Sequence, residues 1–361
     1  MHHLFTFSAG QPLTQRGARA GMYPKFVYKV DQKTPRTFHP PNGEVPMSIL
    51  KNFAAAAALC LGTVPLAHAQ NVALGTLSGA ATGQIGIAIA SVASSGGEIR
   101  VIPQETANTA QYIPLVDQGQ LEFGIANYPQ TYFAMTGTGL SEGQPADNLR
   151  LVASLMDFTS GMLVMDDSGI ATLEDLAGRN VPRFPDNSLG DYVMRAVMAT
   201  ADLSYDDVRA VPTANFLSMY DGFRDGILDT SIATIGSAFV MDMQASVGEV
   251  RYLPMSEEDA PVMDEILPGT RIFDVSGSGE AAVTEDTKVF GYEYLLFANA
   301  DVPDAVVTSM VRALHDGRED LLATSPMWQS FVPEGMARAG GMTYHPGALA
   351  FYQEHGIPVA E

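Results

Sequence analysis

The sequence has little cysteine and little histidine, two residue types that carry much of enzyme and metal chemistry. Cys60 is the only cysteine of the 361 residues, so the chain forms no internal disulfide and no cysteine-rich metal site. Of the seven histidines, only His315, His345 and His355 follow residue 69, and none of them has the spacing of a metal ligand. The motifs G-x-S-x-G and H-E-x-x-H are also missing. We therefore expect no cofactor, no metal and no enzymatic activity.

Basic residues are scarce beyond residue 69. Of the 20 Lys and Arg, seven lie in residues 1–69, which leaves 13; of the 41 Asp and Glu, two lie there, which leaves 39. The net charge after residue 69 is therefore −26, and Lys288 is the only lysine in that part. Nucleic acids and anionic lipid surfaces attract basic patches, so this composition argues against both as partners. No stretch after residue 69 is long and apolar enough to predict a membrane span.

Residues 47–69, MSILKNFAAAAALCLGTVPLAHA, have the pattern of a signal peptide. Lys51 supplies the positive start, and Phe53 to Leu61 form an apolar core that is too short to span a bilayer. Ala67-His68-Ala69 is an A-x-A cleavage site. We therefore expect cleavage after Ala69 and a periplasmic location.

Residues 1–46 would precede this signal, which indicates a misassigned start with Met47 as the true initiator. The alternative interpretation of residues 47–69 is a buried alanine-rich helix, which the cleavage site disfavours.

After the signal, short apolar runs alternate with helical segments, as is typical of an α/β fold. The predicted strands cover residues 72–74, 99–102, 121–126, 151–155 and 180–184, and a new unit is expected to open at 161–165. The predicted helices cover residues from about 84, 108–118, 170–178, from about 188, 216–224 and 303–322. The first helix is expected to follow a glycine-rich turn over residues 75–83.

A ten-residue pattern, x-x-Gly-x-Leu-acid-x-x-Ile-Ala, occurs at residues 117–126 and again at 224–233. In each copy a helix is predicted to end at the glycine and a strand to begin after the acid. We therefore predict two similarly built α/β lobes with a cleft between them. Lobe I is expected to comprise residues 70–156 plus about 286–361, and lobe II residues 157–285.

The segment Gly75–Gln84 follows a predicted strand and opens a helix. Unpaired N–H groups and the helix dipole favour an anion at such a position, and Ser78, Thr82 and Gln84 add donors. The segment matches no dinucleotide fingerprint and no P-loop, so a nucleotide is disfavoured. The alternative is a plain strand-to-helix turn.

The segment Arg183–Ser188 also joins a strand to a helix. Ser188 with Asp191 forms an approximate capping box, so its local role is that of a helix N-cap. Arg183 at the strand end is suited to hold a carboxylate through two hydrogen bonds. A surface salt bridge is an equally good interpretation of Arg183, and the sequence leaves both open.

A third group comprises Asn108 at a helix start and Asn127 with Tyr128 at a strand end. Ligands of open α/β sheets bind outside the carboxyl ends of the strands, where amides can hold a carboxylate or hydroxyl. Taken alone, each asparagine is more often a cap or a turn residue.

These segments, in this order, resemble the TAXI-type solute-binding subunits of TRAP transporters (tripartite ATP-independent periplasmic transporters). The resemblance runs from Val72 to about Gly356. The motifs that carry it are Gly75-Thr76, Gly119-x-Leu-Glu-Phe-Gly-Ile125 with Tyr132-Phe-Ala134-x-x-Gly137, Ser168-Gly-Ile170 with Asp175-Leu-x-Gly178-x-x-Val181, Asp225-Gly226-x-x-Asp229, and His345-Pro-Gly-Ala348 with Tyr352 and Glu354-His-Gly356.

The resemblance implies a class II periplasmic-binding-protein fold with two hinged lobes that close on a small solute. The solute would be an anion such as glutamate or 2-oxoglutarate, passed to membrane permease subunits that use an ion gradient. The ligand positions carried over are Thr76, Ser78, Gly79, Thr82, Gln84, Asn108, Asn127, Tyr128, Arg183, Asn187 and Ser188. The chain departs from the family in these contact loops, and Asp186 there would suit an amine-bearing ligand. A binding protein of an ABC importer or of a sensor is the alternative, and a monomer is expected.

Overall fold

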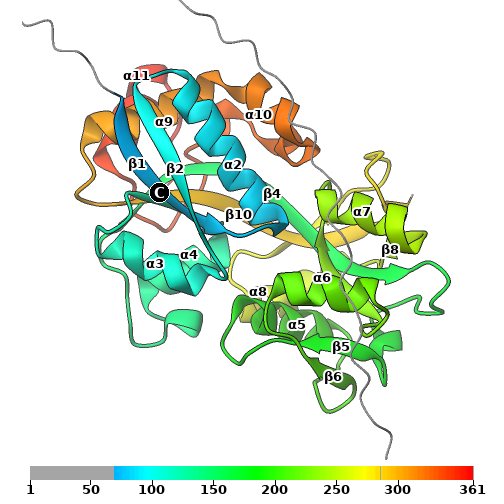
Figure 1. Cartoon of the computed structure of the whole chain (residues 1–361). Helices are drawn as coiled ribbons and strands as arrows, with labels where there is room; N and C mark the ends of the chain where they lie inside the picture. Colours follow the sequence, from blue (N-terminus) through cyan, green and yellow to red (C-terminus); the bar gives the residue numbers. More distant parts are fainter. Residues whose placement is uncertain (1–68, 285, 361) are drawn as a thin grey trace, which may run out of the picture. The chain divides into compact units, whose positions relative to one another are not determined.

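The computed structural model describes residues 69–284 and 286–360 (Figure 1). The predicted extension and all but the last residue of the predicted signal peptide lie outside these ranges. Within them, no helix has both the length and the apolar character needed to cross a membrane.

Strands and helices alternate along the first two thirds of the described chain, and helices dominate its end (Figure 1). The strands are β1 (Gln70–Leu77), β2 (Ile99–Thr106), β3 (Phe123–Asn127), β4 (Leu149–Met165), β5 (Asn180–Arg183), β6 (Arg209–Pro212), β7 (Thr230–Thr234), β8 (Val250–Tyr252), β9 (Arg271–Asp274) and β10 (Lys288–Asn299). The helices are α2 (Ala80–Ser95), α3 (Thr109–Asp117), α4 (Tyr128–Thr136), α5 (Leu189–Thr200), α6 (Phe216–Arg224), α7 (Ala238–Val247), α8 (Ala260–Ile266), α9 (Asp304–Asp316), α10 (Arg318–Thr324) and α11 (Pro346–His355).

Eight of the strands form one mixed sheet with the order β2-β1-β3-β10-β4-β7, to which β8 and β9 add at β4 and β10. Strand β1 runs parallel to β2 and β3, whereas β10 runs antiparallel to β3 and β4. Strands β5 and β6 form a separate parallel pair. Helix α2 packs on β1 and β2, and α9 packs between α2 and α11 (Figure 1).

Strand β4 is one strand of 17 residues where the sequence predicts two separate runs. The prediction of a break was wrong because residues 157–160 pair with β10, from Asp157 opposite Glu293 to Ser160 opposite Phe290, instead of forming a turn. The predicted limit of lobe I after residue 156 therefore falls inside β4. Strands β4 and β10 connect the two predicted lobes, whose limits stay a prediction.

Helix α2 begins at Ala80, four residues earlier than predicted, and β1 extends through Leu77. The glycines of this segment serve close packing, which the sequence-based interpretation as a turn missed. A Cβ on Gly75 would lie 2.7 Å from a ring carbon of the buried Tyr112, and one on Gly83 would lie 2.7 Å from the Leu77 carbonyl oxygen. Only Gly79, with φ 69°, makes the turn.

The segment 170–178 forms a single 3₁₀ turn, Glu174–Leu176, in place of the predicted α-helix. The sequence also predicts Thr172 as the N-cap of this segment, whereas the turn has Leu173 in that position, without a side-chain cap. The Asp175 carboxylate accepts hydrogen bonds from the N–H groups of Ala171 (2.8 Å) and Thr172 (3.0 Å). The predicted helix 303–322 divides at Gly317 into α9 and α10.

The repeated ten-residue pattern has the same structural role in both copies. In each copy the acidic side chain accepts a hydrogen bond from a backbone N–H 49 positions earlier in the chain. Glu122 accepts from the Ala73 N–H of β1 at 2.7 Å, and Asp229 accepts from the Asn180 N–H of β5 at 2.7 Å. In both copies a helix ends before the acid and a strand, β3 or β7, begins after it. The two copies therefore make equivalent contacts at equal spacing, and the similarity of the two predicted lobes stays a prediction.

His345 caps α11 from a buried position, with 1% of its surface exposed. Its Nδ1 accepts a hydrogen bond from the Gly347 N–H at 3.1 Å, so this nitrogen carries no proton in the folded chain. Burial lowers the pKa of His345 below its usual 6.5, against an opposing effect of Asp304, whose carboxylate lies 3.6 Å away. The folded state therefore resists protonation more than the unfolded chain does.

We predict an acid-induced loss of stability from this histidine. Below about pH 6.5 the unfolded chain binds the proton first, so the free energy of unfolding falls as the pH drops towards the lower folded pKa. His345→Asn keeps a capping acceptor that does not titrate. Thermal melts between about pH 7.5 and pH 5 should show a larger drop in Tm for the wild type than for His345→Asn. Parallel curves would contradict this account.

Candidate functional site

A cavity of about 890 Å³ lies where the N-terminal ends of five helices approach the middle of β4 and β10. Helices α2, α3 and α4 line it from one predicted lobe, and α5 and α6 line it from the other. Its polar lining residues near the helix starts and on the strands are Thr82, Asn108, Thr109, Asn127, Gln130, Ser160, Asn187, Ser188, Asn215 and Thr234. Its aromatic lining residues are Phe158, Phe184, Tyr192, Phe216, Tyr220, Tyr292 and Tyr294.

The lining carries no basic side chain among the described residues. Its only charged members are Asp117 and Glu142. Any positive potential inside the cavity must therefore come from the backbone and from neutral donors.

Helix N-termini supply that potential. The N-cap residues Asn108, Asn127, Ser188 and Asn215 of α3, α4, α5 and α6 all line the cavity, and so does Thr82 in the first turn of α2. The first N–H groups of a helix have no partner within the helix, and its dipole places a partial positive charge there. Five such ends around one cavity favour an anionic group inside it.

Two of these helix ends have no side-chain cap. Helices α4, α5 and α6 are capped by Asn127 (3.0 Å to Gln130 N), Ser188 (3.4 Å to Asp191 N) and Asn215 (2.9 Å to Ser218 N). At α2 and α3, the N-cap residues Gly79 and Asn108 make no side-chain cap hydrogen bond. The first turns of α2 and α3 are therefore the best placed to donate to a bound acid.

The middle of β4 and β10 places rings and hydroxyls in the same cavity. Alternate side chains of a strand point to one face, which brings Phe158 and Ser160 of β4 together with Tyr292 and Tyr294 of β10. The Tyr294 hydroxyl donates to Thr82 Oγ1 at 2.6 Å. Burial raises the pKa of Tyr292 and Tyr294, so both phenols stay protonated at neutral pH.

Five of the predicted ligand positions line this cavity: Thr82, Asn108, Asn127, Asn187 and Ser188. They come from three different predicted motifs, so the fold brings the three motifs to one place. Asn187 adopts a left-handed backbone with φ 59°, a conformation that asparagine tolerates better than most residues.

Five other predicted positions lie outside the lining. The Thr76 hydroxyl donates to the Thr82 carbonyl at 3.0 Å, and Gly79 faces Leu217. Ser78 lines a smaller neighbouring cavity of about 360 Å³. Tyr128, whose ring stacks on Tyr132, and Gln84 line neither cavity. We leave these positions out of the proposed site.

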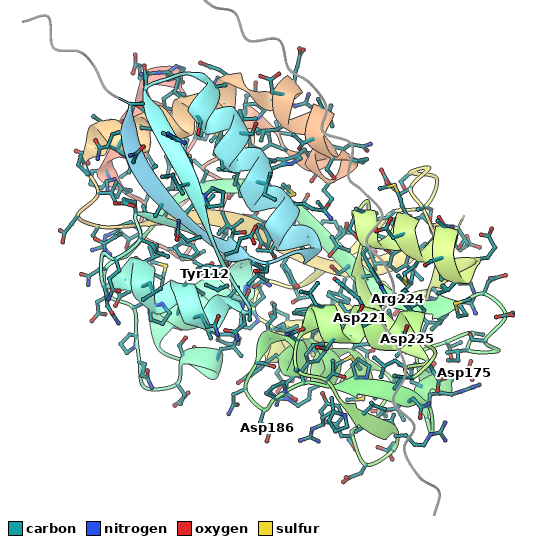
Figure 2. All side chains as sticks on the ribbon, in the orientation of Figure 1. Tyr112, Asp175, Asp186, Asp221, Arg224 and Asp225 are labelled. Atoms are coloured by element: carbon teal, nitrogen blue, oxygen red, sulfur yellow. The ribbon has the colours of Figure 1, made fainter. Side chains whose placement is uncertain are left out.

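Arg183 also lies outside the lining, where its charge is already partnered. Its Nη2 lies 2.9 Å from Asp186 Oδ1, and its guanidinium lies 4.3 Å from the centre of the Tyr205 ring. Asp186 is 76% exposed and stands at the outer edge of its loop (Figure 2). Of the two roles that the sequence left open, the structure shows the surface salt bridge.

We accordingly expect Arg183→Ala to bind solute as the wild type does, within about threefold, because an exposed ion pair contributes little and no ligand contact is lost. Isothermal titration with a carboxylate that binds the wild type measures this. A tenfold or larger loss of affinity would return Arg183 to the site.

Sequence reasoning missed the aromatic lining and Asn215. Asn215 precedes the correctly predicted helix α6 and has the residue type of an N-cap, a signal that was available in the sequence. The rings of Phe158, Tyr292 and Tyr294 carried no such signal, because nothing in the sequence shows which face of a buried strand meets a cavity.

Comparisons with known proteins identify the family. A family model described as the NMT1-like family matches residues 77–356, a range that contains every lining residue of the cavity. The chain belongs to the NMT1-like family. Family membership agrees with the class of protein that the sequence predicts.

Solved structures resemble this NMT1-like protein in fold. The malate-bound MatC from Rhodopseudomonas palustris matches with 14% identity and a TM-score of 0.51, over 80% of this chain and 96% of that one. The ligand-binding component of an ABC-type import system from Staphylococcus aureus, with zinc bound, matches with 10% identity and a TM-score of 0.46, over 81% of this chain and 94% of that one. The predicted fold class is confirmed: the NMT1-like protein has the mixed α/β fold of periplasmic binding proteins.

Proposed function

We propose that this NMT1-like protein is the exported solute-binding subunit of a transporter. It captures a small anionic solute, a carboxylate or an acidic amino-acid-like molecule, in the cavity between its lobes. It then delivers the solute to membrane permease subunits. The family membership supports a binding role, and the structurally similar MatC holds malate.

The main support for an anionic solute is that the N-termini of five helices meet around a cavity whose lining has no basic side chain. Neutral donors can hold an anion where helix ends converge, because the N–H groups and dipoles are fixed before the solute arrives. A binding protein gains from this arrangement, since few side chains must be ordered when the solute binds.

Binding is coupled to closure in this proposal. The cavity takes its lining from both predicted lobes, and Phe133 of α4 already contacts Tyr192 of α5 with ring centres 5.4 Å apart. A solute that touches both lobes stabilises the arrangement in which they meet.

A thermal-shift screen of the purified protein against carboxylates, amino acids and sulfonates tests the binding role. A solute at ~100 times its Kd adds ~2.7 kcal/mol to the free energy of unfolding, which raises Tm by several degrees. The proposal expects the strongest shifts among carboxylates. Shifts only with neutral or cationic solutes would contradict its anionic part, and no shift with any class would contradict the binding role.

We further propose that the permease is of the TRAP type and uses an ion gradient, on the strength of the TAXI resemblance. The alternative is an ABC importer or a sensor. Uptake by cells that carry the protein and its permease should stop when the ion gradient is collapsed and continue when ATP is depleted. The opposite pattern would favour the ABC importer. Separately, we expect the protein to elute from a sizing column as a monomer.

The proposal includes no catalytic role. His315, His345 and His355 lie outside the cavity lining, and no group of three or more His, Cys, Asp or Glu in the described chain could hold a metal. Recovery of a bound solute unchanged after long incubation is the expected result, and any turnover would contradict this part.

A further inference from the structure

Aromatic rings occupy two sides of the cavity. On the strands, the Phe158 ring stacks on Tyr294 with centres 4.8 Å apart and on Tyr292 with centres 5.9 Å apart. On the side of the second predicted lobe, the rings of Phe184 and Phe216 meet with centres 5.1 Å apart. The Tyr294 hydroxyl is held by Thr82, so its ring is fixed in place.

The cavity is also large for a short dicarboxylate. Its volume of about 890 Å³ lies in the upper part of the range of about 300–1,000 Å³ that is typical of sites for drug-sized ligands. A solute of a few carbon atoms would leave most of this volume to water.

One side of the cavity runs along α3 from its positive to its negative end. Asn108 at the start of α3 and Asp117 at its end both belong to the lining, with Ala110, Ile113 and Pro114 between them. Nine residues of helix span about 13 Å. The far end combines the negative end of the dipole with Asp117, so a second carboxylate there would be repelled. Glu142, the other acidic residue of the lining, adds to the negative charge.

These features together specify the solute. We propose that it is a monocarboxylate with an aromatic or similarly bulky apolar body. Its acid group lies at the starts of α2 and α3, and its body packs against Phe158, Tyr294 and Phe216. This inference rests on the proposed function for its acid group and goes beyond it in the shape and single charge of the solute.

Isothermal titration of the purified protein with matched probes tests the inference. The probes are 3-phenylpropionate, propionate, 3-phenylpropanol, malate and glutamate. We expect 3-phenylpropionate to bind at least about tenfold tighter than propionate, malate and glutamate, because only it fills the aromatic part of the cavity. We also expect it to bind at least about tenfold tighter than 3-phenylpropanol, which lacks the acid.

The outcomes separate this inference from the proposed function. Tighter binding of malate or glutamate overturns the inference and leaves the anion-binding function standing. Equal binding of 3-phenylpropanol and 3-phenylpropionate overturns the anionic part of the proposed function and leaves the aromatic body supported. Binding of none of the probes overturns the inference.

Two variants test where in the cavity the ring of 3-phenylpropionate binds. Phe216→Ala should weaken 3-phenylpropionate about tenfold while it leaves propionate unchanged, since only the ring loses its partner. Phe158→Leu, which keeps an apolar side chain in the strand, should weaken the same probe in the same selective way. The control is Ile227→Ala, at a side chain that is 55% exposed and outside the lining. Equal affinity of both ring variants and the wild type for 3-phenylpropionate would overturn the inference.

Discussion

Asn108→Asp should weaken the binding of an acidic solute about 30-fold to 1,000-fold. At a separation of about 4–8 Å and an effective dielectric constant of about 20, the repulsion between two negative charges is about 2–4 kcal/mol. The fold itself should not suffer, because aspartate is as good an N-cap as asparagine and its charge favours the helix dipole. The variant therefore separates binding from stability, which isothermal titration and thermal melts measure on the same sample.

Two further variants sharpen the result. Asn215→Asp makes the same change at the start of α6, on the other side of the cavity, and should also weaken an acidic solute. Asn71→Asp adds one negative charge at an exposed position of β1, outside the lining, and should leave the affinity unchanged. Unchanged binding in both cap variants would mean that the acid group of the solute is not held by these helix ends.

Gly83→Ala should lower the free energy of unfolding by about 1–3 kcal/mol, although alanine usually favours a helix. The added Cβ would lie 2.7 Å from the Leu77 carbonyl oxygen, and this backbone atom cannot move without shifting the end of β1. Any such shift also moves the first turn of α2, so we expect weaker solute binding together with the loss of stability. Urea denaturation and titration with a carboxylate measure the two effects.

Gly96→Ala is the matched control at the other end of α2. A Cβ there would meet nothing within 4 Å, and the backbone conformation is already helical, with φ −70°. The substitution should be neutral or stabilise the protein by up to about 1 kcal/mol. Equal stability of Gly83→Ala and Gly96→Ala would contradict the close-packing role of Gly83.

The sequence was sufficient to predict a helix where a neighbouring residue marks its start or its end. Helix α6 ends before Gly226, where the repeated pattern predicts a helix end, and α5 begins after its predicted cap Ser188. The repeat at 117–126 and 224–233 was likewise a sequence signal, and its two acids make equivalent contacts in the structure.

The sequence was insufficient where the cause of an element lies far along the chain. The predicted strand 151–155 stops before Asp157, whose carboxylate is partnered by Arg271 (3.0 Å) and Arg338 (3.4 Å), which lie 114 and 181 positions away. With its charge paired, Asp157 continues β4. The glycines of the first loop posed the same difficulty, because Tyr112, which requires Gly75, is remote in sequence.

The candidate site was predictable only in part. The N-caps Asn108, Asn127 and Ser188 belong to a residue type that marks helix starts, and in an α/β fold helix starts and strand ends gather at one edge. Arg183 attracted attention because of its charge, yet in so acidic a chain its charge is paired at the surface. The aromatic residues of β4 and β10 could not be predicted as lining residues, because that requires the register between the two strands, which only the structure provides.

The most direct test of the central claim is a crystal structure of the protein with its tightest-binding carboxylate. The account predicts that the carboxylate oxygens accept hydrogen bonds from N–H groups in the first turns of α2 and α3, with no arginine or lysine side chain in contact. A carboxylate that lies outside this cavity, or that is held by a basic side chain such as that of Arg183, would contradict it.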